Sequence, residues 1–233
     1  MTRVAIMQPT YLPWSGYFGL MQAVDIFIFL DSVQFAKRSW QQRNQIKTAK
    51  GAQWLTVPVA SKGKREQLIC EAELDDSTNF ANTHRKSIES NYAKAPWFKE
   101  IAPALLARLE RQMFLADLNI GIIEQCCNLL GIETTVLRSS LMQGRGAKAD
   151  LLASLCKEVG ATEYISVPGS KEYLDKSSAF EDIRVPIRYF NYHHPEYPQL
   201  FGGFLPYMSV IDMLFNCGDQ SADLIRSGIV VSL

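Results

Sequence analysis

Short apolar runs alternate with amphipathic segments along the chain, and this pattern predicts alternating strands and helices. Residues 3–7 (RVAIM) and 25–30 (DIFIFL) are apolar and rich in β-favouring types, as expected of buried strands. Between them, residues 16–24 place Phe18, Met21 and Ala23 at helical spacing. A strand, a helix and a strand within about thirty residues predict a βαβ unit with parallel strands.

The second half of the chain repeats this alternation. Residues 134–140 (TTVLRSS) read as a strand, residues 148–161 as a helix that ends near Gly160, and residues 163–170 (EYISVPGS) as a strand leading into a glycine-containing turn. A further strand is expected over 185–192 and an apolar helix over 209–218, separated by a turn-rich stretch.

Long helical periods replace the alternation between residues 79 and 130. One helix is expected to run to about Tyr92, and a second, after a break at Pro96, carries Leu105, Leu106 and Leu109 on one face, with Pro103 in its first turn. A third amphipathic helix covers 117–130, where Gly131 is placed to cap its end. Before this region, residues 54–60 (WLTVPVA) predict another strand, which Pro58 limits to an edge or a strand end.

Together these segments predict an α/β fold in which a Rossmann-like parallel sheet is flanked by helices. At 233 residues the chain is long enough for one large domain. We therefore expect a single α/β domain over residues 1–233, with a helical insertion at about 75–130.

Composition narrows the class of protein. Lys and Arg number 24, as do Asp and Glu, so the net charge of zero gives no indication of a nucleic-acid partner. The five cysteines are odd in number and form no CxxC pair, which favours reduced thiols and a cytosolic protein. We find no signal-peptide pattern and no apolar run of about 18 residues, so we expect a cytoplasmic protein without membrane insertion.

The loop after the first predicted strand is the first candidate site. Open parallel sheets bind ligands beside the carboxyl ends of their strands, and this loop contains Gln8, Tyr11, Trp14, Gly16 and Tyr17. The aromatic rings can stack on a ligand ring, and Gly16 permits close approach. The alternative is a cluster of aromatic side chains that only packs beneath a rigid loop.

A second polar cluster follows the second predicted strand. If that strand ends near Leu30, Asp31 lies at the same edge of the sheet, and Arg38 and Arg43 can clamp a phosphate or carboxylate. Gln34 and Asn44 belong to the same stretch. A solvated charged surface is the alternative, and it suits Lys37 and Lys47 better than the two arginines.

The remaining candidates are a few histidines, a glycine turn and a tyrosine. His84 lies in a predicted helix, where a structural role is the more frequent one; His194 and Tyr197 lie in the turn-rich stretch. Gly169 and Ser170 follow a predicted strand and can cradle phosphate, although no P-loop or dinucleotide fingerprint is present. His193 and His194 lack the spacing of a zinc site, so no metal is predicted.

Four stretches together resemble the WbqC-like family: QPTYLPWSGYF, DSVQFAKRSWQQRNQIK, SIESNYAKAPWF and YPQLFGGFLPYMSVIDMLFNCG. The resemblance runs over nearly the whole chain and implies a role in O-antigen (lipopolysaccharide) and other surface-polysaccharide biosynthesis, without fixing a reaction. The opening layout is also similar to that of HxGH nucleotidyltransferases and pantothenate synthetase-like ligases. Trp14 and Tyr17 stand where those enzymes have two histidines, while Gly16 matches.

These observations lead to a hypothesis about function: a nucleotide-binding transferase or ligase that modifies a sugar nucleotide by acyl or aminoacyl transfer to an amino sugar. Trp14 and Tyr17 would contact a base or sugar, and Arg38 and Arg43 a phosphate or carboxylate. His84 or His194 would take the amine proton, and Asp31 is the third catalytic candidate. The co-substrate is open between ATP with Mg²⁺ and an acyl or aminoacyl donor. The alternatives are a non-catalytic sugar-nucleotide-binding protein and an ATP-dependent nucleotidyltransferase.

Overall fold

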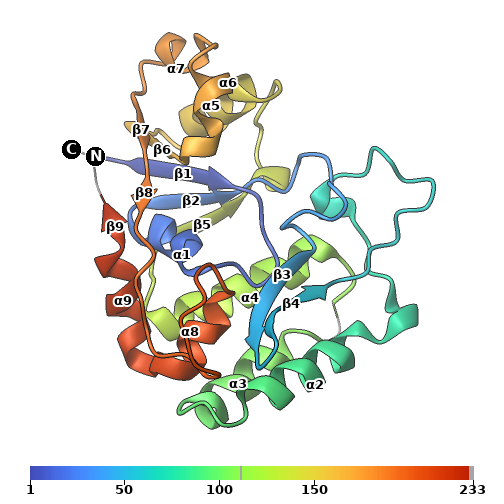
Figure 1. Ribbon diagram of the computed structural model, residues 1–233. Helices are drawn as coiled ribbons and strands as arrows, with labels where there is room; N and C mark the ends of the chain where they lie inside the picture. Colours follow the sequence, from blue (N-terminus) through green and yellow to red (C-terminus); the bar gives the residue numbers. More distant parts are fainter. Residues whose placement is uncertain (111, 231–233) are drawn as a thin grey trace.

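A five-stranded parallel sheet forms the centre of the computed structural model, which describes residues 1–110 and 112–230 (Figure 1). The strand order is β5-β2-β1-β6-β7 and all neighbours run parallel. This confirms the predicted α/β class and its Rossmann-like sheet. The strands are β1 (Arg3–Met7), β2 (Ile26–Phe29), β5 (Thr135–Arg138), β6 (Glu163–Ser166) and β7 (Ile187–Tyr189).

Alternation along the strands divides the core into two layers. Val4 and Ile6 of β1 pack on one face of the sheet, whereas Ala5 packs on the other, as a period of two requires. In β2, Phe27 and Phe29 join the Ala5 face. Both faces are buried, which explains why these strands read as continuous apolar runs.

Helices cover each face of the sheet (Figure 1). The Ala5 face packs against α1 (Ser15–Gln22) and α4 (Leu115–Leu130), with α8 (Val210–Cys217) and α9 (Ser221–Ser227) continuing the same core. The opposite face packs against α5 (Ala149–Glu158), α6 (Lys171–Leu174) and α7 (Ala179–Asp182). Short 3₁₀ turns lie at Ile69–Glu71, Asp76–Thr78, Ser139–Leu141, Pro168–Ser170 and Gly218–Gln220.

A long excursion separates β2 from β5. It contains an antiparallel hairpin of β3 (Arg43–Thr48) and β4 (Gly51–Thr56), then α2 (Phe80–Tyr92), α3 (Phe98–Ala107) and α4. The strand predicted over 54–60 thus belongs to a separate sheet and ends before Pro58. Pro103 lies in the interior of α3 rather than in its first turn, because that helix already begins at Phe98.

The C-terminal part returns to the Ala5 face of the sheet. The strand predicted over 185–192 is divided at Phe190 into β7 and β8 (Asn191–Tyr192), and β8 pairs with β9 (Ile229–Val230). A long loop then leads into α8, whose N-cap Ser209 accepts a hydrogen bond from the backbone N–H of Ile211. Across residues 1–110 and 112–230, no helix combines the length and the apolar character that a membrane crossing requires.

Candidate functional site

A pocket of about 310 Å³ opens at the carboxyl end of β1. In the sheet, β1 lies between β2 and β6. The chain passes from β1 through α1 directly to β2, whereas it enters β6 only after β5, which lies at the edge of the sheet beyond β2. The two loops that leave β1 and β6 therefore diverge here, which is where open α/β sheets bind ligands. The pocket is lined by Met7, Thr10, Pro13, Trp14, Tyr17, Trp40, Asn44 and Tyr207.

Trp14 forms one wall of this pocket and is also the N-cap residue of α1. The Trp14 side chain accepts no hydrogen bond from the N–H groups of the first turn. Because Trp14 lines the pocket, the positive end of the helix dipole lies beside it. The indole bends back over Gly16, where an added Cβ would lie 2.2 Å from the ring. Glycine at position 16 is thus required for the position of Trp14.

Hydrogen bonds fix the loop between β1 and α1. The hydroxyl of Tyr17 donates to the backbone oxygen of Gln8 (3.1 Å), and the side-chain amide of Gln41 donates to Gln8 Oε1 (2.9 Å). Asn119 of α4 donates to the backbone oxygens of Pro9 (3.1 Å) and Gln41 (2.7 Å). Because these contacts come from separate elements, the pocket wall is held in one conformation.

Asn44 closes the other end of the same loop. Its Nδ2 donates to the backbone oxygen of Leu12 (2.7 Å), and Leu12 has a φ of +44°. A leucine in this left-handed region is strained and persists only where its surroundings hold it. Asn44 is buried and also lines the pocket, so it links the strained loop directly to the candidate site.

His84 lies behind the loop and not in the pocket. Its Nδ1 is 2.8 Å from the hydroxyl of fully buried Tyr11, and its other nitrogen donates to the backbone oxygen of Thr56. Burial lowers the pKa of His84 to about 4, so the ring is neutral and accepts the Tyr11 proton. Both ring nitrogens are thus used in packing the loop against α2, and Tyr11 likewise serves as core.

His194 lies in a cage of aromatic rings beside the pocket. It stacks on Trp14 with ring centroids 5.9 Å apart and meets the ring of Tyr207 edge-on at 5.2 Å. Tyr192, Tyr197 and Phe204 complete the cage. Of the two predicted histidines, His194 is the one in contact with pocket residues.

The protonation of His194 follows from its neighbours. Nδ1 lies 2.9 Å from the backbone oxygen of Pro195 and must carry a hydrogen, which leaves Nε2 as an acceptor facing the hydroxyl of Ser15 at 3.4 Å. Burial lowers the pKa of His194 below its usual value. The ring is therefore neutral near pH 7 and can accept a proton at Nε2.

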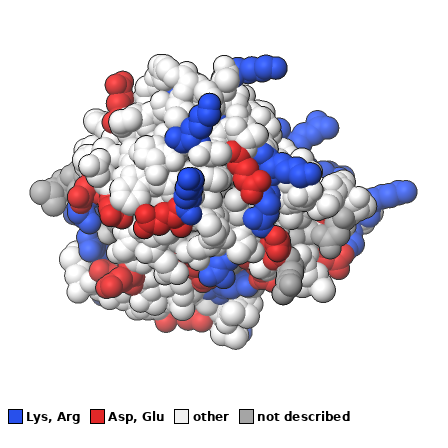
Figure 2. All heavy atoms as spheres, turned by 90° about the horizontal axis from the view of Figure 1, so that it is seen from below, with Lys and Arg blue, Asp and Glu red and all other residues white. Residues whose placement is uncertain are grey.

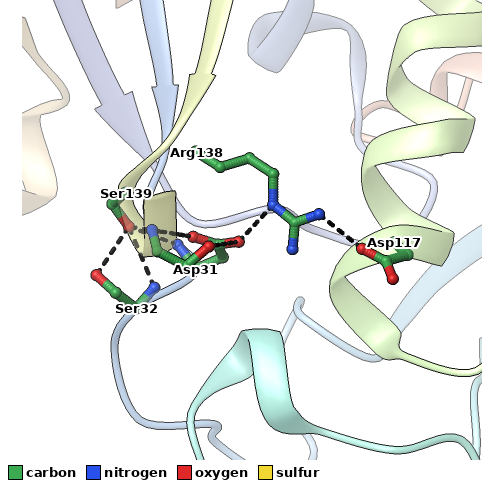
Figure 3. A network of polar contacts seen from close by, with 6 residues as sticks. Asp31, Ser32, Asp117, Arg138 and Ser139 are labelled. Carbon is green, nitrogen blue, oxygen red and sulfur yellow. Dashed lines mark hydrogen bonds and ion pairs between the residues drawn. The ribbon is translucent and has the colours of Figure 1, made fainter. Parts of the chain in front are cut away.

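Asp31 lies at the carboxyl end of β2, as predicted, but its carboxylate is fully buried and bonded (Figure 3). Arg138 Nε donates to Oδ2 (2.7 Å), as does the hydroxyl of Ser140 (2.8 Å). The backbone N–H of Ser140 and the hydroxyl of Ser139 donate to Oδ1. Asp31 thus joins the ends of β2 and β5 and positions Arg138.

Arg138 extends this network toward α4. Its Nη1 donates to Asp117 Oδ1 at 2.7 Å, and Figure 3 shows the guanidinium lying between the two carboxylates. The Arg138 side chain is 29% exposed and that of Asp117 41%, so a ligand can reach both. Asn119, which holds the β1 loop, follows Asp117 by two residues, so the network and the pocket meet at the first turns of α4.

The other predicted residues divide between the pocket surroundings and more distant positions. Arg43 lies over the ring of Trp54 at 4.4 Å, and Arg38 is exposed. Gln34 donates to the backbone oxygen of Arg65, outside the pocket lining. Gly169 and Ser170 form the turn after β6 and do not line the pocket either.

Tyr197 belongs to the cage of His194. Its ring stacks against that histidine with centroids 6.1 Å apart, and its hydroxyl accepts a hydrogen bond from Gln199. Burial raises the pKa of the Tyr197 hydroxyl, which therefore stays protonated.

Several site residues were absent from the sequence prediction. Trp40 and Tyr207 line the pocket, and Ser15 contacts His194. Arg138 is the last residue of β5, at the edge of the sheet where open α/β folds bind ligands, whereas the predicted strand extends to Ser140. Among the described residues, no group of three or more His, Cys, Asp or Glu side chains is arranged to hold a metal ion.

Comparisons with known proteins show the family to which the chain belongs. Residues 8–224 match the WbqC-like protein family. An uncharacterized protein of Mycobacterium tuberculosis, Rv1507c, is 41% identical over 229 residues, covering 97% of this chain and 98% of that protein. No solved structure matches the chain. The matched region contains the lining residues of the pocket except Met7, together with the Asp31 network and the His194 cage, and the chain belongs to the WbqC-like family.

Proposed function

We propose that the protein is a cytoplasmic transferase or ligase that modifies a sugar nucleotide, adding an acyl or aminoacyl group to an amino sugar for a surface polysaccharide such as O-antigen. The observation that carries this proposal is the aromatic pocket at the carboxyl end of β1, beside the first turn of α1. Membership of the WbqC-like family supports a biosynthetic role.

The pocket offers the contacts that such a ligand needs. Trp14, Trp40 and Tyr207 present rings for stacking on a base or against the apolar face of a sugar. The first turn of α1 favours a negative group, so a phosphate would lie there. Arg43 and Arg38, on the stretch that includes Trp40, can neutralise a second phosphate or a carboxylate.

His194 is the residue that we assign to proton transfer. Acyl transfer to an amine forms a bond between nitrogen and the acyl carbon and breaks the bond between that carbon and its leaving group. The amine loses a proton, and the leaving group departs with the bonding electron pair and takes up a proton. Ser15 would pass the amine proton to Nε2 of His194, which is neutral and faces its hydroxyl. His84 and Asp31 instead position the β1 loop and Arg138.

A non-catalytic sugar-nucleotide-binding protein is the second candidate. It is favoured by the engagement of both His84 and Asp31 in internal hydrogen bonds, which leaves one predicted proton acceptor at the pocket. This alternative predicts binding without turnover. An ATP-dependent nucleotidyltransferase would instead release pyrophosphate in the presence of Mg²⁺.

A thermal-shift screen separates these possibilities. Wild-type protein is heated with sugar nucleotides, acyl-CoA species, amino acids and ATP with Mg²⁺, and the screen is repeated with Trp14→Ala. A ligand at one hundred times its Kd stabilises the fold by about 2.7 kcal/mol. Tyr173→Ala, which removes an exposed ring from α6, is the control.

The proposal expects a sugar nucleotide to raise the melting temperature of the wild type and of Tyr173→Ala but not of Trp14→Ala. Product formation with an acyl or aminoacyl donor would then distinguish a transferase from a binding protein. Stabilisation by ATP and Mg²⁺ alone, with pyrophosphate release, would replace the proposal by a nucleotidyltransferase. Equal shifts in the wild type and both variants would show that the ligand does not bind in the pocket.

A further inference from the structure

Charge is strongly segregated along a chain whose net charge is zero. Residues 32–65 contain no Asp or Glu. The same stretch contains eight basic residues: Lys37, Arg38, Arg43, Lys47, Lys50, Lys62, Lys64 and Arg65. The chain therefore contains a basic segment although its net charge is zero. This segment begins after β2 and contains the β3–β4 hairpin.

Two exposed loops bring part of this segment together at one side of the molecule. The backbone N–H of Phe35 donates to the backbone oxygen of Gln67 (2.9 Å), and Gln34 donates to that of Arg65 (2.9 Å). The loop that carries Lys37 and Arg38 therefore lies beside the loop after β4. Figure 2 shows charges of both signs over one face of the molecule, with basic side chains projecting at its right-hand margin.

Two of the basic side chains are already occupied. Lys47 is buried and donates to the backbone oxygens of Gly202 and Gly203, and Lys64 pairs with Glu73. Five others are exposed and have no carboxylate partner among the side chains that the structure describes. These five are Lys37, Arg38, Lys50, Lys62 and Arg65.

Two exposed tryptophans belong to the same basic segment. Trp40 is 54% exposed and Trp54 42%, and their ring centroids are 5.4 Å apart. Arg43 packs over the ring of Trp54 at 4.4 Å. Tryptophan is usually well buried, so a solvent-exposed pair that an arginine braces is a platform on which a further ring can stack.

The loop that carries this platform is held in shape. The backbone N–H groups of Ala36 (2.8 Å) and Arg38 (3.0 Å) donate to the side-chain oxygens of Gln41 and Gln42, respectively. Arg38 adopts a φ of +59°, in the left-handed region that non-glycine residues rarely occupy. Preorganisation of this kind lowers the entropy lost when a partner binds.

We infer that Trp40, Trp54 and the surrounding basic side chains bind a single-stranded nucleic acid, with bases stacked on the tryptophans and phosphates on the lysines and arginines. Stacking platforms combined with a basic surface are typical of single-strand binding. The five cations without a carboxylate partner carry more positive charge than one diphosphate can balance. This favours a polyanion over a second sugar nucleotide as the ligand of this surface. A duplex keeps its bases stacked internally and cannot use the platform.

Trp40 connects this surface to the pocket, because its ring contacts Trp54 and also lines the pocket. A strand lying on the platform would therefore have one end at the pocket mouth. The inference does not depend on which small molecule the pocket binds.

Fluorescence anisotropy tests this directly, using labelled RNA and DNA single strands of about twelve nucleotides. We expect saturable binding. The logarithm of the association constant should fall linearly with the logarithm of the salt concentration, with a slope of about −0.7 per phosphate contacted. Two variants test the surface: Trp54→Ala removes the platform, and Lys37→Glu with Arg38→Glu reverses its charge. The controls are Tyr173→Ala for a lost ring and Lys99→Glu with Lys157→Glu for a reversed charge elsewhere.

Both surface variants should weaken binding by about tenfold or more, whereas the controls should stay within about twofold. Circular dichroism and melting temperature establish that each variant is folded. Separate titrations with RNA and with DNA show which of the two kinds of single strand the surface binds. The inference would be overturned if the control variants lost as much affinity as the surface variants, or if no binding occurred at low salt. It would also be overturned if the protein bound only vesicles that contain anionic lipid, which would indicate a membrane surface instead.

Discussion

The indole of Trp14 covers the backbone of Gly16 so closely that a Cβ atom at position 16 would lie 2.2 Å from its Cη2 atom. Trp14 also stacks on His194 and lines the pocket, so one close approach links the helix start, the histidine cage and the candidate site. Because the φ of Gly16 is not positive, its backbone conformation does not require glycine. Glycine is required because the Trp14 ring leaves no space for a Cβ atom.

Gly16→Ala should therefore displace Trp14 and damage the pocket. We expect a loss of about 1–3 kcal/mol in the free energy of unfolding, as in other overpacked sites, together with loss of ligand-induced stabilisation. The control is Gly121→Ala in α4, where a Cβ meets nothing within 4 Å and alanine favours the helix. If Gly16→Ala bound ligand as the wild type does, the ring of Trp14 would have no part in binding.

His84 should make stability depend on pH in a defined window. Burial lowers its pKa to about 4, whereas the unfolded chain has the ordinary value of about 6.5. The unfolded state binds the proton first as pH falls, so stability is complete above about pH 6.5 and declines toward pH 4. The shift corresponds to about 3 kcal/mol.

Urea unfolding at several pH values measures this effect. Replacing His84 by glutamine should flatten the decline between pH 6.5 and 4, since the titrating group is gone. His193→Gln, at an exposed histidine, should retain the wild-type slope. An unchanged slope in His84→Gln would show that its ring is not held neutral.

Arg138 should contribute strongly to stability because it compensates the fully buried Asp31 carboxylate. Arg138→Met leaves that charge with its serine donors alone and should cost about 3–5 kcal/mol. Arg226→Met breaks the exposed pair with Asp223 and should cost about 0–1 kcal/mol. Chemical denaturation of both variants compares them, and similar losses would contradict the buried role of Asp31.

His194→Gln should reduce turnover while the fold and ligand binding remain. Glutamine can retain a hydrogen bond to Ser15 but cannot accept the amine proton, so we expect a fall of about 10²-fold in kcat. His193→Gln, one residue away, should keep wild-type kcat. Loss of less than a few-fold in His194→Gln would remove the residue from the chemistry.

Local sequence signals predict the strands of the sheet and its longer flanking helices, but not the short helices α6, α7 and α9. The elements β1, β2, β5, β6 and α5 lie within their predicted ranges, and α1 begins one residue before its predicted range, at Ser15. The strand β3 was missed because five of its six residues, Arg43, Asn44, Gln45, Lys47 and Thr48, are polar. Burial of Asn44 and Lys47 depends on partners far away in the chain.

The site was predictable only where its residues are consecutive. The loop from Gln8 to Tyr17 was identified because the strand before it fixes its place at the sheet edge. Tyr207 and His194 reach the same place through folding of the C-terminal loop, which no local pattern indicates. The roles of His84 and Asp31 depended on burial and hydrogen bonding, and these become visible only in three dimensions.

The central claim is that the aromatic pocket beside α1 binds the nucleotide-linked substrate, and a crystal structure with a sugar nucleotide tests it most directly. The account predicts a base or sugar ring against Trp14 and Trp40, with phosphate at the first turn of α1. A ligand bound elsewhere, with this pocket filled by solvent alone, would contradict it.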